Sequence, residues 1–294
     1  MDIDALIAAR PLLLDGGLGR ALMERGFAAG ECPEEWNVSH PDDVADIHRS
    51  FFAAGSDIVN TNTFGGTAMR LEAHGLSARA VELNLAGARL ATGVRDREFP
   101  GHWVAGDIGP CGQMVQPMGN AEPDALRATF TEQARALVDG GVDLLNIETM
   151  FDLTEATIAV EAAVAVADGR PVLASMTFKP AAKGFRTMMG VSPEAAVKAL
   201  KDAGAHLVGC NCEITAEPMA DLVPIMADLG GGVTYAQPNA GQPRLEAGET
   251  VYAETPEHFA AIVSTYPALG AGIVGGCCGT PPASIAALAA ALGR

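Results

Sequence analysis

Basic residues are scarce in this sequence: 19 lysines and arginines stand against 36 aspartates and glutamates, so the formal net charge at pH 7 is −17. A surface with this charge repels polyphosphates and anionic lipid headgroups. Long apolar runs are missing as well, and no segment reaches the roughly 20 apolar residues of a membrane-spanning helix. We therefore expect neither a nucleic-acid partner nor a membrane partner.

The first residues, MDIDALIAARPLLLDGG, have no basic region ahead of an apolar run, so they do not resemble a secretory signal. This predicts a cytoplasmic protein, in which thiols stay reduced. Six cysteines in a reducing compartment call for a chemical reason. Four of them form two close pairs, Cys210 with Cys212 and Cys277 with Cys278.

The apolar content is high enough for a large core, because 49% of the 294 residues are hydrophobic. Short apolar runs alternate along the chain with stretches of helical periodicity. The candidate strands cover 12–16, 57–64, 102–108, 143–149, 171–178, 206–212, 233–239 and 271–277. The candidate helices cover 41–54, 77–95, 123–139, 153–168, 192–203, 217–229, 255–269 and 281–292. This pattern predicts a single (β/α)8 TIM barrel, one domain over residues 1–294, with a doubly wound open sheet as the alternative.

The loops of this pattern are unequal, since those that follow strands are long and those that precede strands are short. The long loops cover 16–40, 109–122, 178–191 and 240–254. In a barrel, the loops after the strands all lie at the C-terminal face, where active sites form. We therefore expect the chemistry at that face.

Two cysteine-rich segments, GCNCE and GGCCGT, fall at the ends of candidate strands. Cys212 ends the sixth strand, and Cys277 and Cys278 end the eighth, so only one strand separates them in a barrel. Three thiolates with an open fourth position are typical of a catalytic zinc site, and soft sulfur favours zinc over magnesium or calcium. The alternative is a set of small core residues, since free cysteine is often buried. Strand alternation points Cys210 and Cys212 to the same face, which leaves open which of the two binds.

Six further sequence motifs precede GGCCGT along the chain. They are LLLDGGLG (12–19), HRSFFAAGSDIVNTNTFGGT (48–67), GDIGP (106–110), IETMFD (147–152), SMTF (175–178) and PNAG (238–241). Together with GxNC and GGCCGT, they resemble the homocysteine S-methyltransferase family over essentially the whole chain. The likeness is greatest to the homocysteine-binding module of cobalamin-dependent methionine synthase, and betaine–homocysteine methyltransferase belongs to the same family.

The resemblance implies a metal site. Cys212, Cys277 and Cys278 match the three zinc ligands of the family. Asn239, in PNAG, matches a polar residue near the zinc and is the candidate for the fourth position when substrate is absent. The implied cofactor is therefore Zn²⁺.

The resemblance also implies substrate-binding residues. Asp15 and Glu148 match acidic residues that hold the amino group of homocysteine. Asn60 and Asn62 lie in the polar series NTNTF, and buried polar groups are costly unless satisfied, so we expect them to line the substrate cavity. The same residues can also have purely structural roles. Asp15 before Gly-Gly suits a turn, and so do the two asparagines. Glu148 and Thr149 can cap the next helix.

The implied reaction is a zinc-dependent transfer of a methyl group to homocysteine, which forms methionine. Zinc removes the thiol proton and delivers a thiolate at neutral pH, so no side chain has to act as a further catalytic residue. In a chain of 294 residues we expect no folate, cobalamin or reactivation domain beside the barrel. The expected methyl donor is therefore methylcobalamin on a separate corrinoid protein.

Other methyl donors and other functions remain as alternatives. Betaine or S-methylmethionine is the alternative donor, although a betaine site needs aromatic faces and aromatics make up only 5% of the chain. The aromatic candidates are Trp36, Phe64, Phe151, Phe178 and Tyr235. A non-catalytic zinc-thiolate subunit that binds homocysteine is a further alternative. A barrel aldolase or isomerase is another alternative, and it needs a Schiff-base lysine, histidine metal ligands or a phosphate loop at a strand end. Lys179 is the nearest candidate for the lysine.

Overall fold

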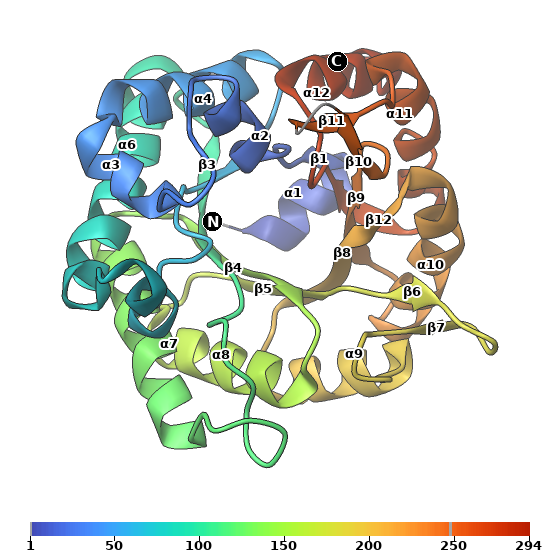
Figure 1. Cartoon of the computed structure of the whole chain (residues 1–294). Coiled ribbons are helices and arrows are strands. Elements are labelled where there is room, and N and C mark those ends of the chain that lie inside the picture. The colour runs from blue at the N-terminus through green and yellow to red at the C-terminus, as the bar shows by residue number, and fades with distance from the viewer. Residues whose placement is uncertain (1, 247–248) are drawn as a thin grey trace.

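Eight parallel strands form one sheet that curves almost into a closed barrel, with helices around it (Figure 1). The computed structural model describes residues 2–246 and 249–294. The strands are β1 (Leu12–Leu13), β2 (Ile58–Asn60), β3 (Trp103–Ile108), β4 (Leu144–Met150), β5 (Val172–Met176), β8 (Leu207–Thr215), β9 (Thr234–Asn239) and β12 (Ala271–Val274). Their order is β1-β12-β9-β8-β5-β4-β3-β2, and each neighbouring pair is parallel. The predicted single (β/α)8 barrel is confirmed.

The two ends of the sheet, β1 and β2, meet through aspartate side chains as well as through the backbone. The N–H of Asp57 donates to the carbonyl of Leu13 at 2.8 Å, and Leu13 N–H donates to the Asp57 carboxylate at 2.8 Å. Asn60 N–H donates to the Asp15 carboxylate at 2.7 Å. These carboxylates take the place of ladder hydrogen bonds and close the barrel.

The helices that cover the barrel match the predicted ones closely. They are α4 (Pro41–Ala53), α6 (Ala80–Glu98), α7 (Pro123–Asp139), α8 (Leu153–Val166), α9 (Pro193–Asp202), α10 (Ala216–Leu229), α11 (Pro256–Val263) and α12 (Pro282–Ala291). The one clear difference is α11, which ends before the predicted residue 269. Pro267 has no N–H, and its ring clashes with the carbonyl four residues earlier. The chain therefore passes into a 3₁₀ turn, η4 (Tyr266–Leu269).

Further elements lie at the N-terminus and in the loops after β1, β2, β5 and β9, and a 3₁₀ turn replaces the first three residues of the helix predicted for 77–95. The helices among them are α1 (Ile3–Ala9), α2 (Leu18–Met23), α3 (Trp36–Ser39) and α5 (Ala68–Leu71), with 3₁₀ turns at Pro33–Glu35, Glu72–His74 and Ser77–Arg79. Two hairpins are β6 (Lys179–Pro180) with β7 (Phe185–Arg186), and β10 (Pro243–Glu246) with β11 (Glu249–Tyr252). None of the helices in the described ranges has the length and apolar character needed to cross a bilayer.

The inside of the barrel is built in layers. An apolar layer contains Ile3 of α1 and inward-facing strand residues, namely Leu12, Leu14, Ile58, Ala105, Leu144, Leu173, Leu207, Tyr235 and Ile273. In Figure 1, α1 is accordingly seen behind the centre of the ring of strands. Alternate residues of a strand face the same side, so the next inward positions lie one layer higher. That layer is polar and buried: Asn60, Asp107, Asn146, Ser175 and Gln237.

Candidate active site

A cavity of about 300 Å³ lies above the polar layer, at the C-terminal ends of the strands. Its lining includes six of the polar and thiol residues named above: Asn60, Asn62, Glu148, Cys212, Cys277 and Cys278. The residues after β1, from Gly16 to Arg20, form another part of the wall. The structure therefore has its cavity at the predicted C-terminal face of the barrel.

Three cysteine sulfurs meet at this cavity. Ligand atoms of Cys212, Cys277 and Cys278 all lie within 4.8 Å of one another. The Sγ atoms of Cys212 and Cys278 are 3.7 Å apart. Tetrahedral zinc with Zn–S bonds of about 2.3 Å requires sulfurs about 3.8 Å apart, so the spacing of this pair fits that ion. The donor set fits a soft divalent cation with its fourth position open to the cavity.

A break in β8 brings Cys212 to this place. Asn211 pairs with Gln237 of β9, but the next pair joins Thr215 to Asn239, so the residues between form a bulge. Cys212 and Glu213 have φ of +57° and +63°, a conformation that non-glycine residues adopt at a cost of about 1–3 kcal/mol. Strand alternation is thereby interrupted at Cys212.

The same break separates the two cysteines of the first segment. Cys210 is 1% exposed and lies in the core between the barrel and its helices. Cys212 lines the cavity instead. The expectation that Cys210 and Cys212 share a face is therefore wrong, because the backbone turns between them.

The other two cysteines follow β12 and are tied to the end of β9. Cys277 N–H donates to the carbonyl of Pro238 at 2.9 Å, and Ala240 N–H donates to the carbonyl of Cys278 at 3.0 Å. Gly279 follows with φ +77°, and a Cβ atom there would lie 2.2 Å from the ring of Tyr252. Glycine is required here by both the backbone angle and the aromatic ring.

Hydrogen bonds among the three thiols change their pKa values in opposite directions. The bonds from Cys212 and Cys277 lower the pKa of Cys278 to about 3. The bonds that Cys277 makes with Cys212 and Cys278 raise the pKa of Cys277. The cluster thus stabilises a thiolate, which is the form that binds metals.

Asn211 connects the thiols to two neighbouring strands, and sequence reasoning misses it. Its amide donates to Cys277 Sγ at 3.7 Å and to Thr149 Oγ1 at 2.8 Å. Its carbonyl oxygen accepts from Thr149 N–H at 2.9 Å and from Ser175 Oγ at 2.8 Å. The only sequence signal is its place in GCNCE. Asn211 therefore joins β4, β5 and β8 beneath the cysteines.

Carboxylates gather on the opposite wall. Burial, followed by the charge of Cys212, raises the pKa of Glu148 to about 7. Burial, followed by the charges of Glu148 and Asp15, raises the pKa of Asp107 well above its ordinary value. Burial also raises the pKa of Asp15, although hydrogen bonds from Asn60 oppose this. Such a cluster favours an ammonium group, whose charge relieves the repulsion.

Asp107 is a cavity residue that sequence reasoning misses. Its Oδ1 atom is buried and has no hydrogen-bond partner within the described residues. The available signal is an acidic residue inside the otherwise apolar strand of GDIGP, where burial is costly without a partner.

The predicted Asp15 lies behind the cavity wall, at 0% exposure. Its carboxylate accepts from the backbone N–H and the side-chain amide of Asn60, at 2.7 and 3.1 Å. The amide of Asn146 then donates to Asn60 Oδ1 at 3.1 Å and to Glu148 Oε2 at 3.3 Å. A continuous network thus runs from Asp15 to Glu148.

The two remaining predicted asparagines have different surroundings. The Asn62 amide donates to the Pro33 carbonyl at 2.7 Å and to Asn37 Oδ1 at 3.0 Å, which holds the segment before α3 against the cavity. Asn239 ends β9 beside the cysteine-bearing strands, and its Oδ1 is buried without a partner in the described part of the chain. It is not among the residues that line the cavity.

Two other roles considered for residues near the site can be compared with the structure: helix capping and a Schiff-base lysine. Asp152, not Glu148 or Thr149, caps α8 by accepting from the N–H groups of Thr154 and Glu155. Lys179 forms an ion pair with Glu213 at 2.6 Å, and its side chain is exposed.

Few aromatic rings line the cavity. Phe64, a predicted candidate, does so, and so does Tyr252, which the sequence does not single out. Tyr235 lies in the apolar layer of the barrel, and its hydroxyl donates to Asn146 Oδ1 at 3.1 Å. Phe178 is buried in the core between barrel and helices.

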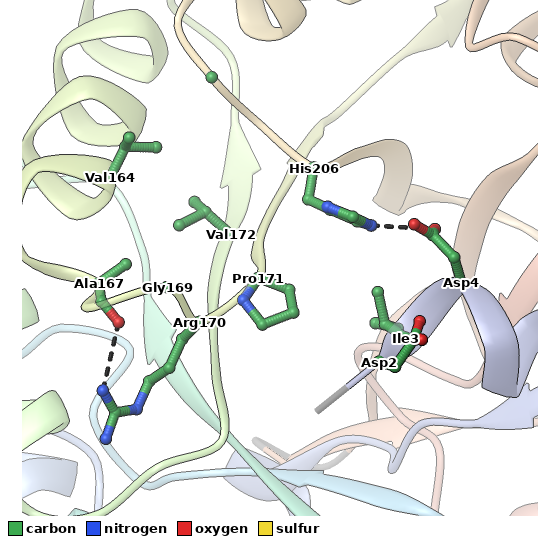
Figure 2. Close-up of a pocket in the computed structure, with 11 residues that line it drawn as sticks. Asp2, Ile3, Asp4, Val164, Ala167, Gly169, Arg170, Pro171, Val172 and His206 are labelled. Carbon is green, nitrogen blue, oxygen red and sulfur yellow. Dashed lines mark hydrogen bonds and ion pairs between the residues drawn. The ribbon is translucent and has the colours of Figure 1, made fainter.

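A second hollow, of about 420 Å³, lies at the opposite end of the strands. It is bordered by α1 and by the segments that lead into β5 and β8 (Figure 2). His206 and Asp4 pair across it at 3.0 Å, and Arg170 hydrogen-bonds to the Ala167 carbonyl. The N-terminal end of a barrel serves stability rather than chemistry, so we place the active site at the other end.

Comparisons with known proteins identify a family. The family model for homocysteine S-methyltransferase matches residues 12–292. Methionine synthases of Mycobacterium leprae and Mycobacterium tuberculosis are each 30% identical to the chain, over 100% and 99% of its residues. The chain spans only 25% of the length of each of these two proteins.

A solved structure gives a similar result. The homocysteine methyltransferase MmuM from Escherichia coli, in its metallated form, is 25% identical, with a TM-score of 0.78. The match covers 95% of this chain and 96% of that one. The chain belongs to the homocysteine S-methyltransferase family, a family of methyltransferases.

Proposed function

We propose that the barrel, taken as one domain over residues 1–294, is a zinc-dependent homocysteine S-methyltransferase that forms methionine. The observation that carries this proposal is the cluster of three cysteine sulfurs within 4.8 Å of one another, facing a cavity with carboxylates on its other wall. The chemistry of these two groups suits a substrate with a thiol at one end and an ammonium at the other.

A zinc ion held by Cys212, Cys277 and Cys278 would supply a Lewis acid that keeps a substrate thiol deprotonated at neutral pH. Asn211 donates a hydrogen bond to the Cys277 sulfur and thereby limits how much charge this ligand gives up. Asn239 is the candidate for the fourth position in the absence of substrate. Soft thiolates have to stay reduced to act in this way, as the cytoplasm allows, and we propose that location.

The carboxylates orient the substrate. Glu148 and Asp107 line the cavity and would bind the ammonium of homocysteine, while buried Asp15 holds Asn60 in the wall. The homocysteine sulfur then attacks the methyl carbon of the donor. A carbon–sulfur bond forms, the bond from methyl to donor breaks, and its electron pair leaves with the donor. The thioether product is a weaker metal ligand than the thiolate, which favours release.

The proposed donor is a methylcorrinoid carried by another domain or protein. Support comes from the similarity to proteins named methionine synthase. Within the described residues only two aromatic rings, Phe64 and Tyr252, line the cavity, which is little for a quaternary ammonium cage. Betaine and S-methylmethionine are therefore comparison donors in the test.

The test is a methyl-transfer assay with homocysteine and each donor in parallel, with metal analysis of the same samples. Cys277→Ser should lose zinc from the thiolate site and lose turnover, whereas Cys210→Ala, a cysteine outside the cluster, should keep both. Full turnover in zinc-depleted Cys277→Ser protein would refute the proposal. Zinc retention without methyl transfer from any donor would favour a homocysteine-binding subunit instead.

A further inference from the structure

A second group of metal-ligating side chains lies outside the active site, where the β10–β11 hairpin returns to the barrel. Glu217 stands in the first turn of α10, Glu254 follows β11, and His258 stands in the first turn of α11. One ligand atom from each lies within 4.8 Å of the others. His258 Nδ1 is 3.0 Å from Glu254 Oε1, and its Nε2 is 3.6 Å from Glu217 Oε1.

The burial of Glu254 and the missing hydrogen-bond partner of one of its oxygens point to a ligand. Its side chain is only 6% exposed, although it belongs to a surface group. Its Oε2 atom is buried and has no hydrogen-bond partner within the described residues. A buried carboxylate oxygen without a partner is unfavourable, and coordination of a cation removes that cost.

The charge of the group also favours a bound cation. Two carboxylates face one imidazole, so the group stays negative even when His258 is protonated. Of the side chains that the structure describes, His258 is the one cationic group within 4.0 Å of either glutamate. A divalent cation would balance both carboxylates.

We propose that Glu217, Glu254 and His258 bind a second divalent cation. Imidazole nitrogen with carboxylate oxygens suits zinc or manganese, in contrast to the all-sulfur set of the active site. The sites differ in chemistry, so this inference stands or falls independently of the proposed function.

The place of this site in the fold gives it a structural task. Glu254 lies two residues after Tyr252, whose ring packs against Gly279, next to Cys278. Glu217 lies in the helix that follows β8, the strand of Cys212. A cation here joins the end of the hairpin to both α10 and α11 and fixes the approach to the thiolates.

Manganese is the discriminating probe, because Mn²⁺ prefers carboxylate and imidazole to thiolate. Metal-depleted full-length protein is titrated with Mn²⁺ and followed by electron paramagnetic resonance. We expect one Mn²⁺ per chain, with the affinity reduced roughly 10-fold or more in Glu254→Gln. Glu257→Gln, at an exposed position of the same helical turn, is the matched control and should bind as the wild type does.

Glu217→Gln is a second test that does not depend on a buried position, because the side chain of Glu217 is 54% exposed. It too should weaken Mn²⁺ binding, while Cys277→Ser should leave it unchanged. Zinc analysis should give two ions in the wild type and one in either Glu217→Gln or Cys277→Ser. Equal Mn²⁺ affinity in wild type and Glu217→Gln, or no Mn²⁺ binding by the wild type, would overturn the proposal.

Discussion

Asn211 shows how one side chain can serve both stability and chemistry. It accepts hydrogen bonds from Thr149 N–H and Ser175 Oγ while donating to Cys277 Sγ. Thr149 itself has φ +61°, so this bond holds a strained residue at the end of β4. The position of Asn211 therefore fixes three strand ends relative to the thiolates.

We predict that Asn211→Asp weakens zinc binding at the thiolate site by roughly 10- to 100-fold, because a carboxylate replaces the donor to Cys277 and adds repulsion. Competition with a chelator measures this. Asn211→Ala should instead lower the free energy of unfolding by roughly 2–4 kcal/mol, since two buried donors lose their acceptor. Unchanged metal affinity in Asn211→Asp would show that the bond to sulfur has no role.

Glu148 is the carboxylate whose loss should act on substrate binding. Glu148→Gln removes the charge that pairs with the ammonium, so KM for homocysteine should rise roughly 10- to 100-fold, while zinc content stays constant. Glu161→Gln, on the outer face of α8, is the control. A change in zinc content with KM unaltered would assign Glu148 to the metal instead.

The residues of the site differ in how far sequence can predict them. The three cysteines stand in recognisable motifs at strand ends, so the barrel predicts that they lie at the same face on nearby strands. Asp107 and Asn146 are isolated polar residues in apolar strands, and their roles depend on which strands the barrel places beside them. The place of Cys212 depends on a bulge, which alternation in the sequence does not reveal.

At the scale of elements, periodicity and caps locate the strands and helices that build the barrel, although β1 ends at Leu13 and β2 at Asn60, short of the predicted residues 16 and 64. The short elements in the loops are not predicted, because they lack a long periodic pattern. The two strands of the β10–β11 hairpin have four residues each and α2 has six, so neither element is long enough to show a period of its own. These are the elements that surround the cavity, so the site is less predictable than the scaffold.

His48, in helix α4, makes the free energy of unfolding depend on pH. Burial lowers the pKa of His48 to about 4, and neither ring nitrogen has a partner within the described residues. The unfolded chain binds a proton near pH 6.5, so the neutral folded form loses stability as the pH falls from about 6.5 to 4. The loss should reach about 3 kcal/mol at pH 4. Denaturant unfolding of His48→Leu across this range should lack that slope, and an identical slope would contradict the assignment.

For the whole molecule, Asp57 joins the two ends of the chain at the closure of the barrel. Arg10 and Arg294 donate to its carboxylate at 2.8 and 2.6 Å. Burial alone would raise the pKa of Asp57, but these bonds outweigh burial and lower it. The stability that these ion pairs contribute is therefore fully present above the unfolded pKa of about 3.9 and is lost as the pH falls from there through the lower pKa of the folded state.

We predict that Asp57→Asn lowers the free energy of unfolding at neutral pH by about 2–3 kcal/mol, because it leaves the Leu13 N–H and two guanidinium groups without their carboxylate. Asp202→Asn, which breaks the exposed pair with Lys198, should change it by less than about 0.5 kcal/mol. Equal effects of the two changes in denaturant unfolding would show that closure does not depend on Asp57.

The central claim is that three cysteine sulfurs hold a zinc ion to which the homocysteine sulfur adds. X-ray absorption at the zinc edge tests it directly, on Glu217→Gln protein so that the thiolate site is observed alone. The account predicts three sulfur neighbours at about 2.3 Å without substrate and four with homocysteine. A zinc environment of nitrogen and oxygen only, or a sulfur count that homocysteine leaves unchanged, would contradict it.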